Sequence, residues 1–299
     1  MINRAEISII NENYSEACYY YKKSFKINGG SSNDNYNALL CALELKDVSF
    51  VDYNAKRLVE KGICTNFFDQ FSDIKNDKIY LNKIKNMKES NQNINWNYRN
   101  ELEKMLSDDQ NVRPINKSNS AIAKIVDSVN FVKFKILVEK YGYPSESMIG
   151  IKCSENLKGI APQPQNILLR HFFQRHYFEL DTLLFKALKT LQITPEEYAT
   201  YTYFKNAPNT RCDISPISKI DDKYYVYKTS DSLSLALEKN RKSICLYSRK
   251  DHIEKMKFNQ TKNSKEFRIS PFTAINSFSG FPSEIKDSLI KNDFQVINF

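Results

Sequence analysis

Three separate segments carry side chains whose types and spacing are suited to chemistry. Asp109 and Arg113 are four residues apart, so on a helix they can form an ion pair or a clamp for a carboxylate or phosphate. Asp127 and Asn130 lie one helical turn apart, and inward-facing polar groups there need partners such as Arg113 or His171. We therefore take Asp109, Arg113, Asp127 and His171 as candidate catalytic residues. The alternative is a helix cap and a buried structural network.

His171 is the candidate acid–base group. Its neighbours Leu168, Phe172 and Phe173 are apolar, so we expect its ring to be at least partly buried. His171 and His176 are five residues apart, roughly 140° around a helix, and cannot share one metal ion as an i, i+4 pair can. No metal site is predicted.

Other polar side chains near these positions are candidate binding groups. They are Gln110, Asn130, Arg170, Gln174, Arg175 and His176. The spacing from Arg170 to His176 loosely resembles the Arg-to-His motif of HEPN-type ribonucleases, although the gap is longer here. The chain contains no Walker loop, no dinucleotide fingerprint and no Gly-x-Ser-x-Gly motif, so no cofactor is predicted.

Composition indicates a folded, helix-rich chain. The 299 residues are 41% hydrophobic and 13% aromatic, which excludes disordered and low-complexity classes, and only 7 are Gly, which disfavours turn-rich all-β folds. The net charge of +9 permits a nucleic-acid partner, but the Lys and Arg residues are spread thinly, so such a partner is disfavoured. No apolar run reaches membrane-span length and no signal peptide is evident. We expect a cytoplasmic protein without membrane contact; export stays open if a leader has been removed.

The first 74 residues show a pattern typical of tetratricopeptide units. Apolar stripes at helical spacing cover residues 14–25, 36–45 and 51–59, with Ser32 or Asn33 as the expected cap of the second stripe. These stripes make one and a half units, whereas a free-standing array needs about three. The layer should therefore pack on the rest of the chain. A generic helical bundle is the alternative.

The candidate residues fall on the helices expected next. One begins at 98 and ends where Pro114 forces Arg113 out of helical geometry. A second covers 120–141 with a broad apolar face, and a third, long helix covers 165–191. Thr194, Pro195 and Glu197 form a capping box that begins another helix.

Beyond residue 206 the pattern changes. Tyr224–Tyr227 is β-prone and predicts one strand of a hairpin, 233–242 predicts a last helix, and 267–299 predicts loop or short strand. The expected fold is mainly α, with tetratricopeptide-like hairpins packed on a second α-helical domain that has a small β element near the C-terminus. The expected domains are 1–74 and 98–299, joined by a polar linker at 75–97.

Five short blocks occur in an order and spacing that we recognise. They are Asp109-Gln110-x-x-Arg113, Asp127-x-x-Asn130, Tyr141-Gly142-Tyr143-Pro144 followed by Gly150, the helix around His171, and Pro195-x-x-Tyr198-Ala199. Over roughly residues 98–205 the chain resembles the bacterial family described as domain of unknown function 6624. Residues 240–246 resemble a downstream part of that family, with Cys245 where a glycine is expected. The Gln-x-Tyr-Gly-Thr element usual after the Tyr-Ala block, and an Arg near it, are absent.

The resemblance implies no reaction, because the family has none established. Two hypotheses follow for function. The first is a scaffold that binds a protein or peptide in a helical groove, suggested by the helix pairs with aromatic stripes. The second is a hydrolase or HEPN-like ribonuclease that uses His171 with Asp109, Arg113 and Asp127. The second requires His171 to lie within about 10 Å of the others, because a general base must reach its substrate directly or through one water. The partner and the oligomeric state do not follow from the sequence.

Overall fold

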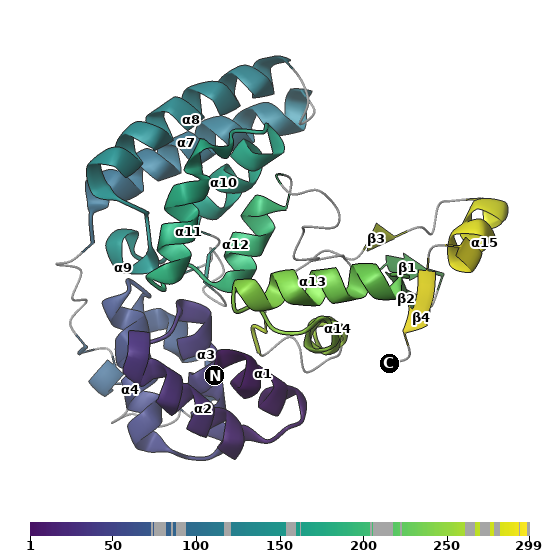
Figure 1. The fold of residues 1–299 in the computed structure, drawn as a ribbon. Coiled ribbons are helices and arrows are strands. Elements are labelled where there is room, and N and C mark those ends of the chain that lie inside the picture. The colour runs from purple at the N-terminus through teal and green to yellow at the C-terminus, as the bar shows by residue number, and fades with distance from the viewer. Residues whose placement is uncertain are drawn as a thin grey trace. The chain divides into compact units, whose positions relative to one another are not determined.

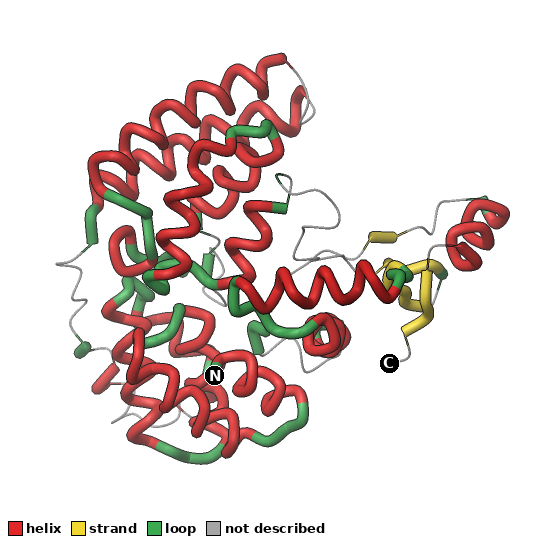
Figure 2. The backbone as a smooth tube through the Cα atoms, viewed as in Figure 1, coloured by secondary structure: helices red, strands yellow, loops and turns green. Residues whose placement is uncertain are grey.

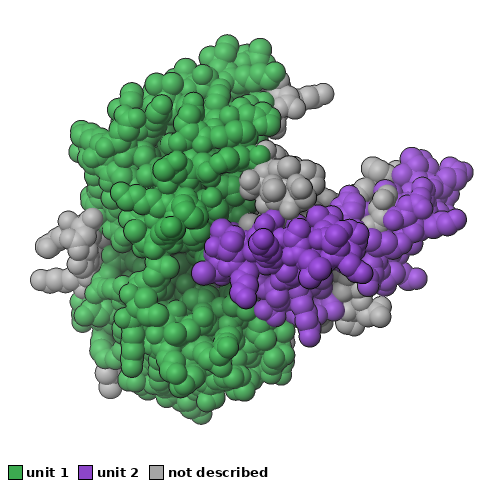
Figure 3. Space-filling model, viewed as in Figure 1, with its two compact units in different colours: residues 1–205 green, residues 206–299 purple. Residues whose placement is uncertain are grey.

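A computed structural model describes the chain as two compact units. The described residues are 1–72, 74, 82–84, 86–87, 94–116, 121–153, 160–161, 163–203, 205, 218–221, 223–260, 267–269, 276–277, 282–292 and 294–297. The first unit covers Met1–Lys205 and the second covers Asn206–Phe299 (Figure 3). The division at 205/206 differs from the expected linker at 75–97, most of which lies outside the described residues.

Four helices joined by short turns form the N-terminal layer of the first unit (Figure 1). They are α1 (Ile2–Ile10), α2 (Tyr14–Asn28), α3 (Ser32–Glu44) and α4 (Val48–Glu60), followed by the 3₁₀ helix η1 (Thr65–Gln70). Each α-helix contacts the next one along the chain. The stripes at 14–25, 36–45 and 51–59 correspond to α2, α3 and α4, whereas α1 was not predicted.

Turn chemistry and one acidic residue position this layer. Gly29 at φ 75° ends α2, and Ser31 caps α3 in place of the expected Ser32 or Asn33. Glu146, in the short helix α9 (Glu146–Ile149), accepts hydrogen bonds from the Ser32 backbone N at 2.8 Å and from Lys61 Nζ at 3.1 Å. The layer therefore packs on the later helices of its own unit, as predicted.

Helices α7 (Trp96–Asn116), α8 (Ala121–Tyr141) and α10 (Pro164–Gln174) contact one another and hold the candidate residues (Figure 1). Helix α8 confirms the prediction for 120–141. The predicted end at Arg113 is wrong, because α7 continues through Pro114 to Asn116. Proline removes one helical hydrogen bond, but the ion pair that Arg113 makes with Asp109 one turn earlier stabilises this last turn.

The single long helix predicted at 165–191 is also wrong. The chain instead forms α10, the 3₁₀ helix η3 (Phe178–Leu180) and α11 (Asp181–Lys189). The break is a Schellman motif, in which the backbone N–H groups of His176 and Tyr177 bond to the carbonyls of Phe173 and Phe172. His176 takes the left-handed position at φ 63° and so lies beyond the helix that carries His171.

Helix α12 (Pro195–Thr202) contacts α10 and α11 and begins with the predicted capping box. Thr194 accepts a hydrogen bond from the Glu197 backbone N, and the Glu197 carboxylate accepts one from the Thr194 backbone N at 2.8 Å. Burial raises the pKa of Glu197 to about 7, with the charges of Glu146 and Glu196 adding to the shift and hydrogen bonds from Thr194 and Asn166 opposing it. Glu197 is therefore half ionised near neutral pH in the folded protein.

We expect Glu197→Gln to flatten the pH dependence of stability between pH 5 and 8. A carboxyl whose pKa is raised on folding contributes its full stability below its unfolded pKa and loses it as pH rises through the folded pKa. In the wild type, the free energy of unfolding should fall by about 2–3 kcal/mol from this group as pH rises, since one pKa unit corresponds to about 1.4 kcal/mol. The figure is set below the full value because the Glu197 side chain keeps some contact with water. Urea unfolding of both proteins at several pH values measures it. Parallel curves for the variant and the wild type would contradict the prediction.

The second unit contains a small sheet in the order β3-β1-β2-β4. The strands are β1 (Ser218–Ile220), β2 (Lys223–Tyr227), β3 (Asn276–Ser277) and β4 (Phe294–Ile297). Strand β2 pairs antiparallel with β1 and β4, while β3 pairs parallel with β1. The register places Ser218 opposite Tyr225, and the buried side chains of Ile220, Tyr225 and Phe294 pack together. The predicted hairpin strand at Tyr224–Tyr227 is confirmed.

Three helices complete the described part of the second unit: α13 (Asp231–Ser243), α14 (Arg249–Phe258) and α15 (Ser283–Asn292). The helix predicted at 233–242 is confirmed as α13, but it is not the last one, and the loop or short strand predicted at 267–299 contains α15. The charge-rich sequence of α14 lacks the periodic apolar stripe on which those predictions relied.

The fold is mainly α with a small sheet toward the C-terminus, as predicted (Figure 2). Within the described residues, no helix combines the length and the apolar character needed to cross a membrane.

Cys245 occupies a backbone position that suits glycine, as the family resemblance led us to expect. It follows α13 at φ 59°, and the N–H groups of Cys245 and Leu246 bond to the carbonyls of Lys242 and Arg241 in a second Schellman motif. We expect Cys245→Gly to raise the free energy of unfolding by about 1 kcal/mol, because the Cβ is unfavourable in the left-handed region. Urea unfolding measures the change. Cys245→Ala keeps the Cβ and should match the wild type; equal effects of both variants would assign the change to the thiol.

Candidate acid–base site

Five charged or titratable side chains meet where three helices of the first unit converge. Asp109 and Arg113 come from α7, Asp127 from α8, His171 from α10, and Arg175 from the residue that caps α10. The two carboxylates are 1% and 2% exposed, whereas the side chains of Arg113, His171 and Arg175 are 12%, 15% and 16% exposed. The carboxylates therefore lie beneath a layer of basic groups. The partly buried ring predicted for His171 is confirmed.

Asp109 orients two of these basic groups at once. Its Oδ1 lies 3.0 Å from His171 Nδ1 and 2.5 Å from Arg113 Nη2, and its Oδ2 accepts from Arg113 Nε at 3.0 Å. Gln110 Nε2 also donates to Oδ2, at 2.6 Å. Because an ionised carboxylate only accepts hydrogen bonds, Nδ1 of His171 is the donor, and Nε2 is the ring nitrogen that Asp109 does not contact.

Asp127 links the second arginine to the same cluster. Its Oδ1 accepts from Arg113 Nη2 at 2.6 Å, and its Oδ2 accepts from Arg175 Nε at 2.7 Å. Arg113 therefore bridges the two carboxylates, and the i, i+4 spacing of His171 and Arg175 brings both to one face of α10. The convergence that the hydrolase hypothesis required is present.

The two carboxylates have opposite pKa shifts. Burial raises the pKa of Asp109, but hydrogen bonds from His171 and Arg113 outweigh it, so the pKa lies well below the usual range. Burial also raises the pKa of Asp127, and the hydrogen bond from Arg175 together with the charge of Arg113 offsets this only in part, so the pKa stays above its ordinary value. Asp109 is thus the permanent anion that holds His171 in place.

Two nitrogen atoms of the cluster remain available to a ligand. In the part of the chain that the structure describes, the hydrogen bonds of His171 and Arg113 do not involve His171 Nε2 or Arg113 Nη1. Both groups are bonded to Asp109 through their other nitrogens and are partly exposed. A base and a cationic donor are therefore bonded to the same carboxylate, Asp109, and acid–base catalysis on an anion can use both groups.

The remaining candidate binding residues divide into two groups. Gln110 belongs to the cluster through Asp109, whereas Asn130 is 1% exposed and donates to the backbone carbonyl of Met105 at 3.0 Å, so it joins α8 to α7. The exposed side chains that make no described contact with the cluster are Arg170, Gln174 and His176. Helix α10 ends between Arg170 and His176, and the resemblance of their spacing to the HEPN motif stays a prediction.

A possible metal set also lies here and was missed by the sequence analysis, which considered only pairs of histidines. One ligand atom each from Asp109, Asp127 and His171 lies within 4.8 Å of the others. Two carboxylates and an imidazole suit a divalent transition metal. However, the Arg113 guanidinium already bonds to both carboxylates, so a cation has to displace it. The charges present favour proton transfer over metal chemistry.

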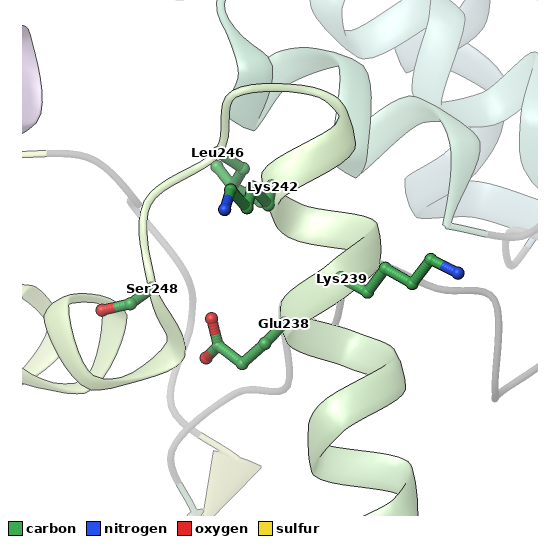
Figure 4. A pocket seen from close by; sticks show the side chains of 5 residues that line it. All are labelled: Glu238, Lys239, Lys242, Leu246 and Ser248. Carbon is green, nitrogen blue, oxygen red and sulfur yellow. The ribbon is translucent and has the colours of Figure 1, made fainter.

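A pocket in the second unit has a different character. It measures about 430 Å³ and is lined by Glu238, Lys239, Lys242, Leu246 and Ser248 (Figure 4). The carboxylate of Glu238 accepts a hydrogen bond from the Arg249 backbone N at 2.8 Å, at the first residue of α14. The carboxylate of Glu238 therefore stabilises the start of α14, and we assign this pocket no catalytic role.

No family model, curated protein or solved structure matches the chain. The resemblance to the family described as domain of unknown function 6624 thus stays a prediction, as does the tetratricopeptide-like character of α1–α4.

Proposed function

We propose that the first unit is a phosphate-ester hydrolase with His171 as its general base. The proposal rests on one observation: the carboxylate of Asp109 accepts hydrogen bonds from both His171 Nδ1 and Arg113. His171 Nε2 and Arg113 Nη1 are the nitrogens of these two groups that the carboxylates leave unused. The alternative is a purely structural ion-pair network, and the two make different predictions for substitutions of His171.

Burial favours an anionic substrate. The carboxylates of Asp109 and Asp127 are almost fully buried, so an approaching molecule meets the partly exposed Arg113, His171 and Arg175. Guanidinium groups bind phosphate oxygens through strong, charge-assisted hydrogen bonds. A phosphate ester fits this surface better than a neutral ester.

The proposed step is hydrolysis of the phosphate ester by water. His171 Nε2 takes a proton from water, the water oxygen forms a bond to phosphorus, and the bond between phosphorus and the leaving-group oxygen breaks. The protonated ring then returns that proton to the leaving oxygen. Arg113 donates to a non-bridging phosphate oxygen while negative charge builds up on it. Asp109 holds the ring in the correct tautomer and stabilises the imidazolium that forms.

Hydrolysis of four substrates tests the proposal: p-nitrophenyl phosphate, bis(p-nitrophenyl) phosphate, p-nitrophenyl acetate and a labelled single-stranded RNA. We expect turnover of a phosphate ester and none of the acetate. In parallel, inorganic phosphate should shift the imidazole proton resonances of His171 and leave those of His176 unchanged. Absence of both turnover and the phosphate-dependent shift would reject the proposal. Cleavage of the RNA alone would narrow it to the ribonuclease alternative.

Other expectations from the sequence also remain proposals. They are a bacterial origin, peptide binding by the α1–α4 layer, and a cytoplasmic location. A protein-binding role is supported by the exposed apolar face of α8, and that face does not include His171.

A further inference from the structure

Helix α8 exposes an apolar stripe on the side away from the acid–base site. Its members are Ile122, Ile125, Val129, Val132 and Ile136, with exposed fractions of 50%, 63%, 48%, 56% and 59%. The broad apolar face predicted for 120–141 is therefore divided. Phe134 and Val138 are buried on the same side as Asp127, and the stripe lies on the opposite side at about 100° per residue. Soluble proteins rarely leave so many large apolar side chains contiguous and uncovered without a partner.

The spacing of the stripe is that of a helix–helix seam. Successive members are separated by 3, 4, 3 and 4 residues, the heptad pattern in which a second helix packs along the first. All five side chains are β-branched, and the stripe ends at the exposed Glu139. From Ile122 to Ile136 it is roughly 21 Å long at 1.5 Å per residue, enough for two heptads of a partner helix.

Lysines border this seam on both sides. At about 100° per residue, Lys133 and Lys140 lie on one side and Lys135 on the other, and all three are exposed. Among the described residues of α8, the exposed acidic side chain is Glu139. The seam is therefore apolar at its centre and positively charged at its edges.

We propose that α8 binds an amphipathic helix of a partner protein whose apolar stripe is bordered by Glu or Asp. In a paired-helix interface the residues beside the seam decide which partner is accepted, through attraction and repulsion of charge. Acidic borders on the partner would face the α8 lysines in either helix direction.

Two other occupants fit the observations less well. A second copy of α8 would bring lysine against lysine, which disfavours self-association through this face. A membrane surface attracts lysines, but helices that insert into it usually carry Trp, Phe or Leu on a broad apolar face. The α8 stripe contains only Ile and Val in a narrow heptad seam.

Fluorescence anisotropy with two designed peptides tests the proposal on the full-length chain. Both peptides are labelled 21-residue helices with Leu and Ile at the seam positions; one has Glu at the bordering positions and the other has Lys. We expect the Glu peptide to bind with Kd on the order of 10 µM and the Lys peptide at least tenfold more weakly. The variant Ile125→Gln/Val132→Gln should weaken binding of the Glu peptide at least tenfold. Leu235→Gln removes an apolar residue of α13 that is 73% exposed and serves as the matched control.

Charge reversal completes the design, because Lys133→Glu/Lys135→Glu should reverse the preference between the two peptides. Equal binding of both peptides, or an unchanged Kd in the seam variant, would overturn the proposal. So would seam-dependent dimerisation in analytical ultracentrifugation, which would identify a second copy as the occupant. Seam-dependent sedimentation with phosphatidylserine vesicles, with no preference for the Glu peptide, would identify a membrane surface.

Discussion

His171→Asn is expected to lower turnover of a phosphate ester by about 10²–10⁴-fold, the usual contribution of a general base. Asparagine places an N–H donor close to the position of His171 Nδ1, so the bond to Asp109 can be kept, but it has no group at the position of Nε2. The free energy of unfolding should fall by about 1 kcal/mol or less, since a hydrogen-bonded donor is retained. Steady-state kinetics and urea unfolding of the same protein measure both quantities.

His176→Asn is the matched control. His176 is exposed and lies at φ 63°, a conformation that asparagine adopts readily, so this variant should keep the activity and the stability of the wild type. If the His171 variant keeps full activity, or if both variants lose activity equally, His171 is not the base. A His171 variant that unfolds several kcal/mol more easily would instead support the structural network.

Asp109→Ala is expected to destabilise the protein by about 3 kcal/mol. The substitution leaves Arg113 without its bidentate partner in a site that is 12% exposed, and it removes the acceptor of His171. Breaking a buried ion pair from one side typically costs about 3–5 kcal/mol, and we take the lower end because the released guanidinium is near the surface. Urea unfolding at pH 7 measures the change.

Asp108→Ala is the neighbouring control and should shift stability by no more than about 0.5 kcal/mol, because Asp108 is outside the cluster. Asp109→Ala/Arg113→Ala should be less destabilised than the sum of its single variants, since neither residue leaves the other unpaired and Asp127 keeps Arg175 as a partner. A difference below about 1 kcal/mol between Asp109→Ala and Asp108→Ala would contradict a central role for Asp109.

Local patterns predicted the parts of this protein that depend on neighbouring residues. The capping box at Thr194 and Glu197 is confirmed because its groups are three residues apart and satisfy each other. The ion pair of Asp109 with Arg113 follows from i, i+4 spacing in the same way. The glycine-like position of Cys245, by contrast, was expected from the family resemblance and not from a local pattern.

Helix ends without strong local signals could not be predicted. The apolar periodicity of 165–191 continues across His176, and neither Gly nor Pro marks the Schellman motif there, so a single helix was inferred. At Pro114 the error was the reverse, since a helix end was predicted where the helix continues. The ion pairs of Arg113 with Asp109 and Asp127 stabilise α7 there and offset the unfavourable helix propensity of proline. Intrinsic helix preference is less than about 1 kcal/mol per residue for most residue types and about 3 kcal/mol for proline, so it could not by itself place either helix end.

The sequence by itself determined the mainly α fold, the residue types at the site and the i, i+4 spacing that allows Asp109 to pair with Arg113. Only the tertiary structure decided that Asp127 and His171 join them, because their separation along the chain is bridged by packing of three helices. It also decided which side of α8 is buried. Both sides carry apolar residues at helical spacing, so periodicity cannot distinguish them, and burial depends on where α7 and α10 lie.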